Sequence, residues 1–220
     1  MKYIDGIDKI LSNYKDIDQS KIYEDVLTNI FENYGQEHIV KSIPKDVFKL
    51  RAILLKETDR GAALMAVSYL ENLLEKLLMN FFVDDNSLSK KLLKHGELSS
   101  FASKKDLAYL LGLISSREKR NLELIRRIRN EFAHSAENID FSSSCINNRC
   151  IELDYNIFND DISGRNKFIR VVFCLAGSIS SSTKENKRRK EKPNKNFEEI
   201  GFKKLIENFN EELSNEINKY

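Results

Sequence analysis

The chain has 220 residues, of which 41% are hydrophobic and 32% are charged, and its formal net charge is +2. This balance is typical of a soluble globular protein, and the length suits one well-buried core better than two full domains. No apolar run approaches the roughly eighteen residues of a membrane span. Acidic residues interrupt the N-terminal segment, so a signal peptide is not expected either. We therefore predict a cytoplasmic protein with no membrane contact.

Chain breakers are scarce, with only 8 Gly and 2 Pro, which favours long helices over a many-turned β-sandwich. Apolar periodicity and capping residues predict helices, in chain order, at 2–14, 20–34, 44–56, 61–83, 87–95, 107–114, 117–136, 164–182 and 197–218, with a short element near 144–153. The helix at 61–83 is apolar on nearly all sides, so we expect it at the centre of the fold. The predicted class is an all-α bundle of about eight helices.

The segment from residue 184 to 195 is strongly basic, with seven basic and two acidic residues. We interpret it as a solvated linker that could also contact RNA, DNA or an acidic partner. The predicted organisation is an N-terminal helical extension at 1–43, a core at 44–182, a basic linker at 183–196, and a C-terminal helix at 197–220 that packs on the core.

The cysteines and histidines do not follow a metal-ligand spacing. Cys145, Cys150 and Cys174 fall where apolar residues are needed, and the three histidines lie far apart in the sequence. Buried thiols that act as small hydrophobic side chains are therefore favoured over a metal site or a disulfide framework. We expect no metal and no cofactor.

The helix predicted at 117–136 contains the most informative chemistry. Asn130 and His134 lie four residues apart and project together from its polar side. Arg129 instead falls between Leu122 and Ile125 in the apolar sector of the helical wheel. A guanidinium in that sector needs an acid or a phosphate, because a buried unpaired charge costs several kcal/mol.

Two interpretations of this segment stay open. In the structural one, Arg129 forms an ion pair with the acidic stripe of Glu71 and Glu75 on the central helix. In the functional one, His134 moves a proton, Arg129 holds phosphoryl oxygens and Asn130 orients one of them. Those three groups suffice for metal-free attack of an RNA 2′-hydroxyl on its neighbouring phosphate.

Three blocks of sequence, in this order, resemble the bacterial mannitol-operon repressor family: ETDRGAALMAVSYLENLLEKLL, LSSFASKKDLAYLLGLIS and NLELIRRIRNEFAHS. The resemblance spans about residues 45–180. The last block also resembles the Arg-x4-His motif of the wider HEPN superfamily, with Arg129 and His134 in the two fixed positions. The resemblance implies a HEPN-like helical bundle.

Many members of that superfamily dimerise and cleave RNA without a metal. The resemblance therefore implies a homodimer with RNA as a candidate partner, and a metal-independent endoribonuclease of a stress-response or phage-defence type. The implied catalytic residues are Arg129, Asn130 and His134. The implied supporting polar cluster that faces them is Asp59, Arg60 and Glu71. Candidate nucleic-acid contacts are Arg126, Lys187, Arg188, Arg189 and Lys190.

The repressor name of the family implies a different activity. The best DNA-reading candidate, KKDLAYLLGLISSREKRNLELI, has helix-turn-helix spacing at Ala108 and Gly112. Glu118, however, occupies a position that needs a packed aliphatic residue, and the second helix already uses its apolar face for the core. This argues against direct sequence-specific DNA binding. The alternative function is a non-catalytic repressor or co-repressor that acts through contacts with a regulatory protein partner.

Overall fold

The structure is a computed structural model that describes residues 18–135, 138–155, 163–194 and 201–219. Over these ranges the chain forms ten α-helices and one short π-helical segment, η1, and no strand. The predicted all-α class is therefore confirmed. The helix predicted at 2–14 lies outside the described residues. No helix in these ranges is both long enough and apolar enough to cross a membrane.

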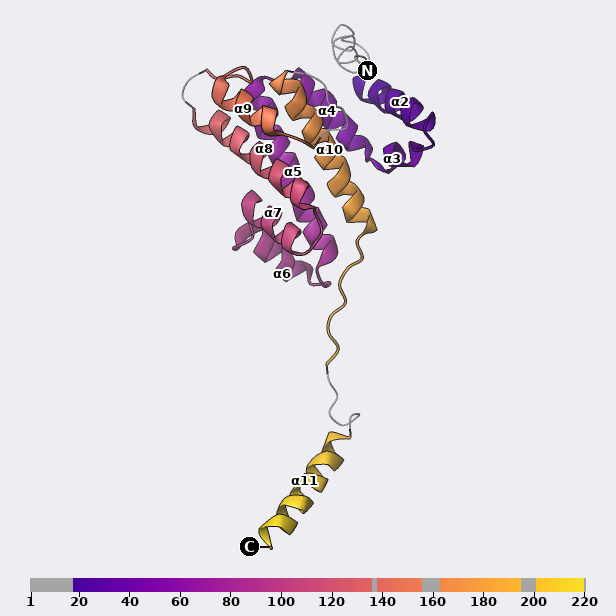
Figure 1. The fold of residues 1–220 in the computed structure, drawn as a ribbon, viewed down its shortest axis with the longest axis vertical. Helices are drawn as coiled ribbons and strands as arrows, with labels where there is room; N and C mark the ends of the chain where they lie inside the picture. The colour runs from indigo at the N-terminus through magenta and orange to yellow at the C-terminus, as the bar shows by residue number, and fades with distance from the viewer. Residues whose placement is uncertain (1–17, 136–137, 156–162, 195–200, 220) are drawn as a thin grey trace. The chain divides into compact units, whose positions relative to one another are not determined.

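The helices of Figure 1 have the following bounds: α2 Gln19–Glu32, α3 Glu37–Ser42, α4 Lys45–Lys56, α5 Asp59–Phe81, α6 Asn86–Lys90, η1 Lys91–His95, α7 Phe101–Leu110, α8 Ser116–His134, α9 Ser144–Glu152, α10 Gly164–Glu185 and α11 Phe202–Ile217. The chain divides into two compact units, Met1–Arg189 and Lys190–Tyr220. The first unit contains α2 to α10, and the second contains α11.

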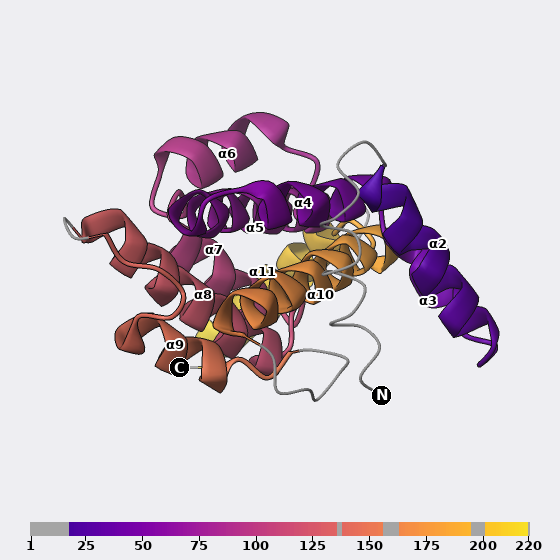
Figure 2. The ribbon, with the colours of Figure 1, turned by 90° about the horizontal axis from the view of Figure 1, so that it is seen from above.

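The central helix of the first unit is α5, as its sequence predicts. It packs against α4, α7, α8 and α10, and Figure 2 shows α5 and α10 side by side. Its apolar residues are buried on almost every turn because neighbouring helices cover most of its surface. Ala62 and Ala66 are completely buried, as are Leu70, Leu74 and Leu77. The core of the unit therefore forms around this helix.

Two predicted bounds are wrong. The helix predicted at 107–114 is α7, which begins at Phe101, because the Ser100 hydroxyl accepts a hydrogen bond from the Ser103 amide (3.0 Å). It ends at Leu110, and Gly112 follows with φ of 70°, a left-handed conformation that a helix cannot continue through. The short helix α3 was not predicted from the sequence.

Aromatic contacts join α2 to the bundle. The ring of Tyr23 lies 6.4 Å from that of Phe48 and 5.5 Å from that of Phe173, between ring centroids. The Arg51 guanidinium lies 3.5 Å from the centroid of the same Tyr23 ring. The described part of the N-terminal region is thus packed on α4 and α10.

The second unit contains one amphipathic helix. The helix α11 has no buried residue, and its large apolar side chains are 42% to 65% exposed. These are Phe202, Leu205, Ile206, Phe209, Leu213 and Ile217. The packing of this helix on the core stays a prediction.

Candidate functional site

The helix α8 holds the residues that the sequence singles out. It begins with a capping box in which the Ser115 hydroxyl accepts from the Glu118 amide while the Glu118 carboxylate accepts from the Ser115 amide. Its apolar stripe is completely buried at Leu122, Ile125, Ile128 and Phe132. Arg60, at the start of α5, donates to the Ser135 carbonyl just after α8 (2.9 Å). The two helices therefore run antiparallel, with the C-terminal end of α8 beside the N-terminal end of α5.

The three predicted catalytic residues lie at this C-terminal end of α8. Arg129 and Asn130 are half-buried, and His134 is exposed. Within the described ranges none of the three side chains takes part in a hydrogen bond or ion pair. At 100° per residue, Asn130 and His134 are about 40° apart around the helix, whereas Arg129 and His134 are about 140° apart. Asn130 and His134 therefore share a face of α8, and Arg129 projects from a different face.

The ion pair of the structural interpretation, between Arg129 and the acidic stripe of α5, is not formed in the described part of the chain. The ammonium of Lys104 on α7 lies 3.1 Å from a carboxylate oxygen of Glu71 and 3.1 Å from one of Glu75. The Lys104 side chain is only 4% exposed, so this cation already balances the stripe. Lys104 could not be predicted as the partner from the sequence, because the local pattern KKDL does not indicate which lysine faces α5.

The supporting polar cluster is also only partly correct. Asp59 accepts a hydrogen bond from the Phe141 amide (2.9 Å) and pairs with Arg165, so its carboxylate fastens the segment after α8 to α5. Arg60 lies next to the end of α8 through its bond to the Ser135 carbonyl. Glu71 lies roughly 18 Å further along α5 than Asp59, since each helical residue adds about 1.5 Å. The three residues therefore do not form one cluster.

The candidate nucleic-acid contacts are divided between two places. Arg126 on α8 is bound to Glu123 through two hydrogen bonds, at 3.0 and 2.7 Å. Arg188 pairs with Asp84, and the Arg189 amide donates to the Phe81 carbonyl at the end of α5 (2.8 Å). Lys187 and Lys190 are exposed. Two arginines of the basic segment, Arg188 and Arg189, are thus fixed to the end of the bundle.

The cysteines have different surroundings. Cys150 is buried, and this burial raises the pKa of its thiol to about 12. Cys174 is half-buried and Cys145 is exposed, so the prediction that all three occupy apolar positions is wrong for Cys145. Across the described ranges no three His, Cys, Asp or Glu side chains are grouped closely enough to hold a metal ion.

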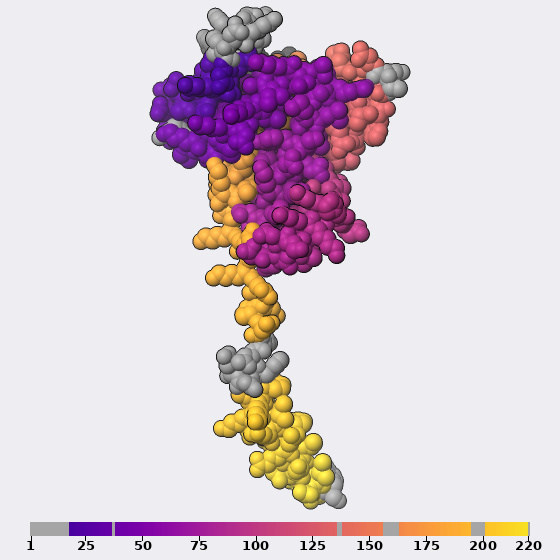
Figure 3. Space-filling view, turned by 180° about the vertical axis from the view of Figure 1, so that it is seen from behind, coloured from indigo at the N-terminus to yellow at the C-terminus, as the bar shows by residue number. Residues whose placement is uncertain are grey.

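An open groove between α4 and α5 was not predicted from the sequence. It has a volume of about 500 Å³, and Figure 3 shows the face of the molecule on which α4 and α5 reach the surface. Three large apolar side chains line it while remaining accessible: Ile53 is 44% exposed, Leu64 38% and Met65 37%. Polar residues complete the lining, namely Asp46, Lys49, Ser68 and Asn72.

Tyr69 adds a hydrogen-bond donor to this groove, which we call the α4–α5 groove. Burial and the nearby charge of Asp46 raise the pKa of the Tyr69 hydroxyl to about 12. The hydroxyl therefore keeps its proton at neutral pH. The groove combines an apolar centre with polar groups at its edge, which is the usual composition of a protein–protein contact surface.

Comparisons with known proteins show a similarity to a solved structure. No protein-family model matches the chain, and no curated protein matches it. The chain is similar to a chain of the X-ray structure of the MtlR–HPr complex from Escherichia coli, with a TM-score of 0.50 and 20% sequence identity. The match covers 61% of this chain and 98% of that chain. The fold is therefore MtlR-like, and the HEPN assignment stays a prediction.

Proposed function

We propose that this chain is a regulatory protein of the mannitol-operon repressor type, and that it acts by binding a protein partner in the α4–α5 groove. The accessible apolar groove is the observation that supports the proposal most directly. The similar Escherichia coli structure is a complex with HPr, so HPr is the first partner to test.

The groove residues are suited to a protein contact. Fully burying a large aliphatic or methionine side chain contributes about 1.5–3 kcal/mol. Ile53, Leu64 and Met65 each retain roughly two fifths of their surface in solvent, so covering them adds about 2–3 kcal/mol in total. Methionine and tyrosine are enriched at such interfaces, and this groove contains one of each. A charged side chain placed in the centre of the groove should therefore prevent docking.

The experiment is a calorimetric titration of purified HPr into the full chain and into variants. We expect Leu64→Glu and Met65→Glu to weaken binding by about tenfold or more each, since a desolvated carboxylate costs over 1.4 kcal/mol. Leu110→Glu is the matched control, because Leu110 is 78% exposed on α7 and does not line the groove. Failure of HPr to bind, or equal binding by the groove variants and the wild type, would contradict the proposal.

A second candidate function is metal-independent RNA cleavage at the end of α8. The supporting observation is that Asn130 and His134 share an accessible face, and that within the described ranges Arg129 has no hydrogen bond or ion pair. In this proposal His134 transfers the proton, Arg129 holds phosphoryl oxygens and Asn130 orients one of them. Because Arg129 and His134 project from different faces, the pair comes from two copies that meet in a homodimer.

This candidate has its own test. Wild type, His134→Ala and the control His95→Ala are incubated with total RNA and with a structured RNA in EDTA. The candidate predicts 2′,3′-cyclic phosphate ends from wild type and from His95→Ala, and no cleavage by His134→Ala. Intact RNA with well-folded wild-type protein refutes it.

A further inference from the structure

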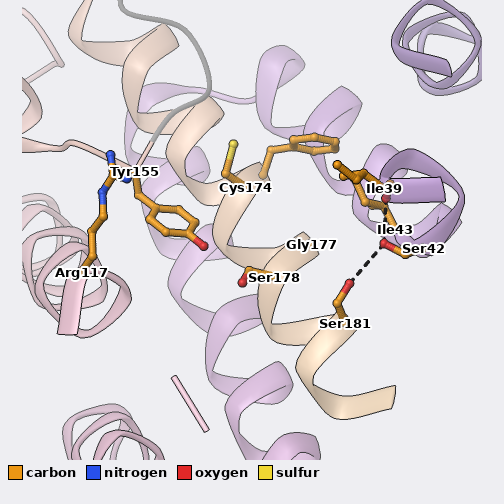
Figure 4. A pocket seen from close by; sticks show the side chains of 10 residues that line it. Ile39, Ser42, Ile43, Arg117, Tyr155, Cys174, Gly177, Ser178 and Ser181 are labelled. Carbon is orange, nitrogen blue, oxygen red and sulfur yellow. Dashed lines mark hydrogen bonds between the residues drawn. The ribbon is translucent and has the colours of Figure 1, made fainter. Parts of the chain in front are cut away.

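A trough of about 410 Å³ crosses one face of α10 in the first unit (Figure 4). Its floor is formed by five residues of α10, one side by the end of α3, and the other side by residues near α8 and α9. The lining residues are Ile39, Ser42, Ile43, Arg117, Tyr155, Phe173, Cys174, Gly177, Ser178 and Ser181. The trough therefore brings together parts of the chain that are far apart in sequence.

Gly177 keeps the middle of the trough open. A Cβ atom at this position would lie 3.5 Å from Cγ1 of Ile43, which is ordinary van der Waals contact. Alanine would therefore fit, whereas a larger side chain would extend into the trough. The glycine lets the α10 backbone form part of the floor, and apolar side chains of Ile39, Ile43 and Phe173 lie around it.

The polar side of the trough is arranged to accept hydrogen bonds. Glu118 is 5% exposed and lies behind the residues that line the trough. Its Oε1 accepts hydrogen bonds from Ser178 Oγ (2.6 Å) and from Tyr155 Oη (3.4 Å). Burial raises the pKa of Tyr155, so this hydroxyl keeps its proton. Because both hydroxyl protons are directed at Glu118, the lone pairs of Ser178 and Tyr155 remain for a ligand.

The charge closest to Ser178 and Tyr155 also favours a donor. The Arg117 guanidinium lies at one end of the trough, where its Nε is 3.8 Å from Asp154 Oδ1 and it donates to the Asp154 carbonyl, and Asp154 also pairs with Arg120 (3.1 Å). The Glu118 carboxylate behind the lining residues accepts four hydrogen bonds, two of them from the Ser115 amide and hydroxyl. A carboxylate-bearing ligand would meet acceptor oxygens and a buried negative charge, which is unfavourable.

We propose that the trough binds a small amphipathic molecule that has an apolar body, such as a bicyclic aromatic ring, and an ammonium or hydroxyl group. The apolar body lies against Ile39, Ile43 and Phe173. The donor group reaches the oxygens of Ser178 and Tyr155. The volume lies within the range of small-molecule sites in proteins.

Three probes with the same ring test this on the full chain: tryptamine, tryptophol and indole-3-acetate. The readout is the rate at which iodoacetamide modifies Cys174, followed by peptide mass spectrometry, with the exposed Cys145 as internal control. At twice its Kd a bound probe lowers the Cys174 rate about threefold by mass action. We expect this protection from tryptamine and tryptophol and none from indole-3-acetate, while the Cys145 rate stays constant.

Variants of α10 test whether the protection of Cys174 arises from binding in the trough. Gly177→Leu fills the trough and should abolish protection, and Ser178→Ala should weaken tryptamine binding by about tenfold. Ser182 lies on the same helix and does not line the trough, so the Ser182→Ala variant should bind tryptamine as the wild type does. No protection by any probe, equal protection by all three probes, or unchanged protection in a folded Gly177→Leu or Ser178→Ala variant would overturn the proposal.

A second inference concerns the charges of α11. Lys203 and Lys204 lie in its first turn, and Glu211, Glu212 and Glu216 lie in its second half, where Glu216 also pairs with Lys219 just after the helix (2.5 Å). This is the reverse of what a helix dipole favours, because the positive N-terminal end carries cations and the negative C-terminal end carries acids. In an antiparallel pair each basic end would meet the acidic end of the other copy, so the sequence is complementary to itself.

We infer that α11 pairs antiparallel with α11 of a second copy of this chain, and that the pairing covers the exposed apolar stripe from Phe202 to Ile217. An isolated helix of this length is only marginally stable in water. Burial of the apolar stripe against a second copy would stabilise it. The antiparallel arrangement places Lys203 of one copy beside Glu216 of the other.

The test is zero-length cross-linking of a mixture of ¹⁴N and ¹⁵N full-length chains. We expect mixed-isotope cross-links that join Lys203 or Lys204 to Glu212 or Glu216. A chain with Lys203→Glu and Lys204→Glu should not cross-link to itself, and should do so again when mixed with a Glu212→Lys, Glu216→Lys chain. Absence of mixed-isotope cross-links within α11, or links between like ends, would overturn the inference.

Discussion

The buried ammonium of Lys104 allows a direct test of which cation balances the acidic stripe of α5. Lys104→Met keeps the length and the apolar stem of the side chain, but it removes the charge that lies 3.1 Å from both Glu71 and Glu75. The two carboxylates, one helical turn apart, then lose their common partner. The fold should become less stable because two partly buried negative charges face each other.

The size of this loss follows from burial. Breaking a fully buried ion pair costs about 3–5 kcal/mol. The Glu71 and Glu75 side chains are 30% and 16% exposed, and a second ammonium, that of Lys94, lies 3.8 Å from Glu75. Water and Lys94 therefore offset part of the loss, and we expect the free energy of unfolding to fall by about 2–3 kcal/mol.

Urea unfolding followed by circular dichroism measures this change. Lys76→Met, at an exposed position on the same helix, is the matched control and should change the free energy of unfolding by less than about 0.5 kcal/mol. Arg129→Gln should cost less than about 1 kcal/mol, because within the described ranges Arg129 has no ion pair. An Arg129→Gln variant as unstable as Lys104→Met would contradict the assignment of Lys104 as the main counter-charge, and would indicate a structural role for Arg129.

Three further predictions concern Glu123, the cysteines and the helix α11. The hydrogen bond from Arg126, together with other nearby cations, holds the pKa of Glu123 well below its usual range. The ionised Glu123 therefore stabilises the fold above pH 4.5, and this stabilisation is lost as the pH falls toward the lowered pKa of the folded state. In urea unfolding, the free energy of unfolding should fall less between pH 6 and about pH 3 for Glu123→Gln than for wild type. Iodoacetamide at neutral pH should modify the exposed Cys145 at least tenfold faster than Cys150, whose thiol has a pKa of about 12; equal rates would contradict its burial. Removal of residues 190–220 should leave the Tm of the first unit within about 4 °C of the full chain in calorimetry, because α11 has no buried residue; a larger fall would mean that α11 packs on the core.

Helix positions could be predicted from the sequence where apolar periodicity is strong. The central helix α5 and the amphipathic helix α8 are both correct to within a few residues, because each has a continuous buried stripe. The start of α7 was missed because its first turn, Phe101 to Lys104, has a single large apolar residue and therefore no visible period, and the Ser100 cap was not used as a signal. The short helix α3 has too few residues for a period to be visible.

The functional surfaces were harder to predict because they depend on tertiary contacts. The sequence places Glu71 and Glu75 on one face of a helix, but only the packing of α7 shows that Lys104 lies against them. The α4–α5 groove and the trough on α10 are formed by side chains from separate helices. Local patterns do not contain this information, since an exposed Leu64 or Met65 has the same periodicity as a buried one.

Methyl NMR during a titration with HPr shows whether a protein partner docks in the α4–α5 groove. The chain is labelled at Ile, Leu and Met methyl groups, and we expect the largest shifts at Ile53, Leu64 and Met65, while the methyl groups of Leu110 on α7 do not shift. Absence of any shift at saturating HPr, or shifts confined to residues outside the groove, would contradict docking in the groove.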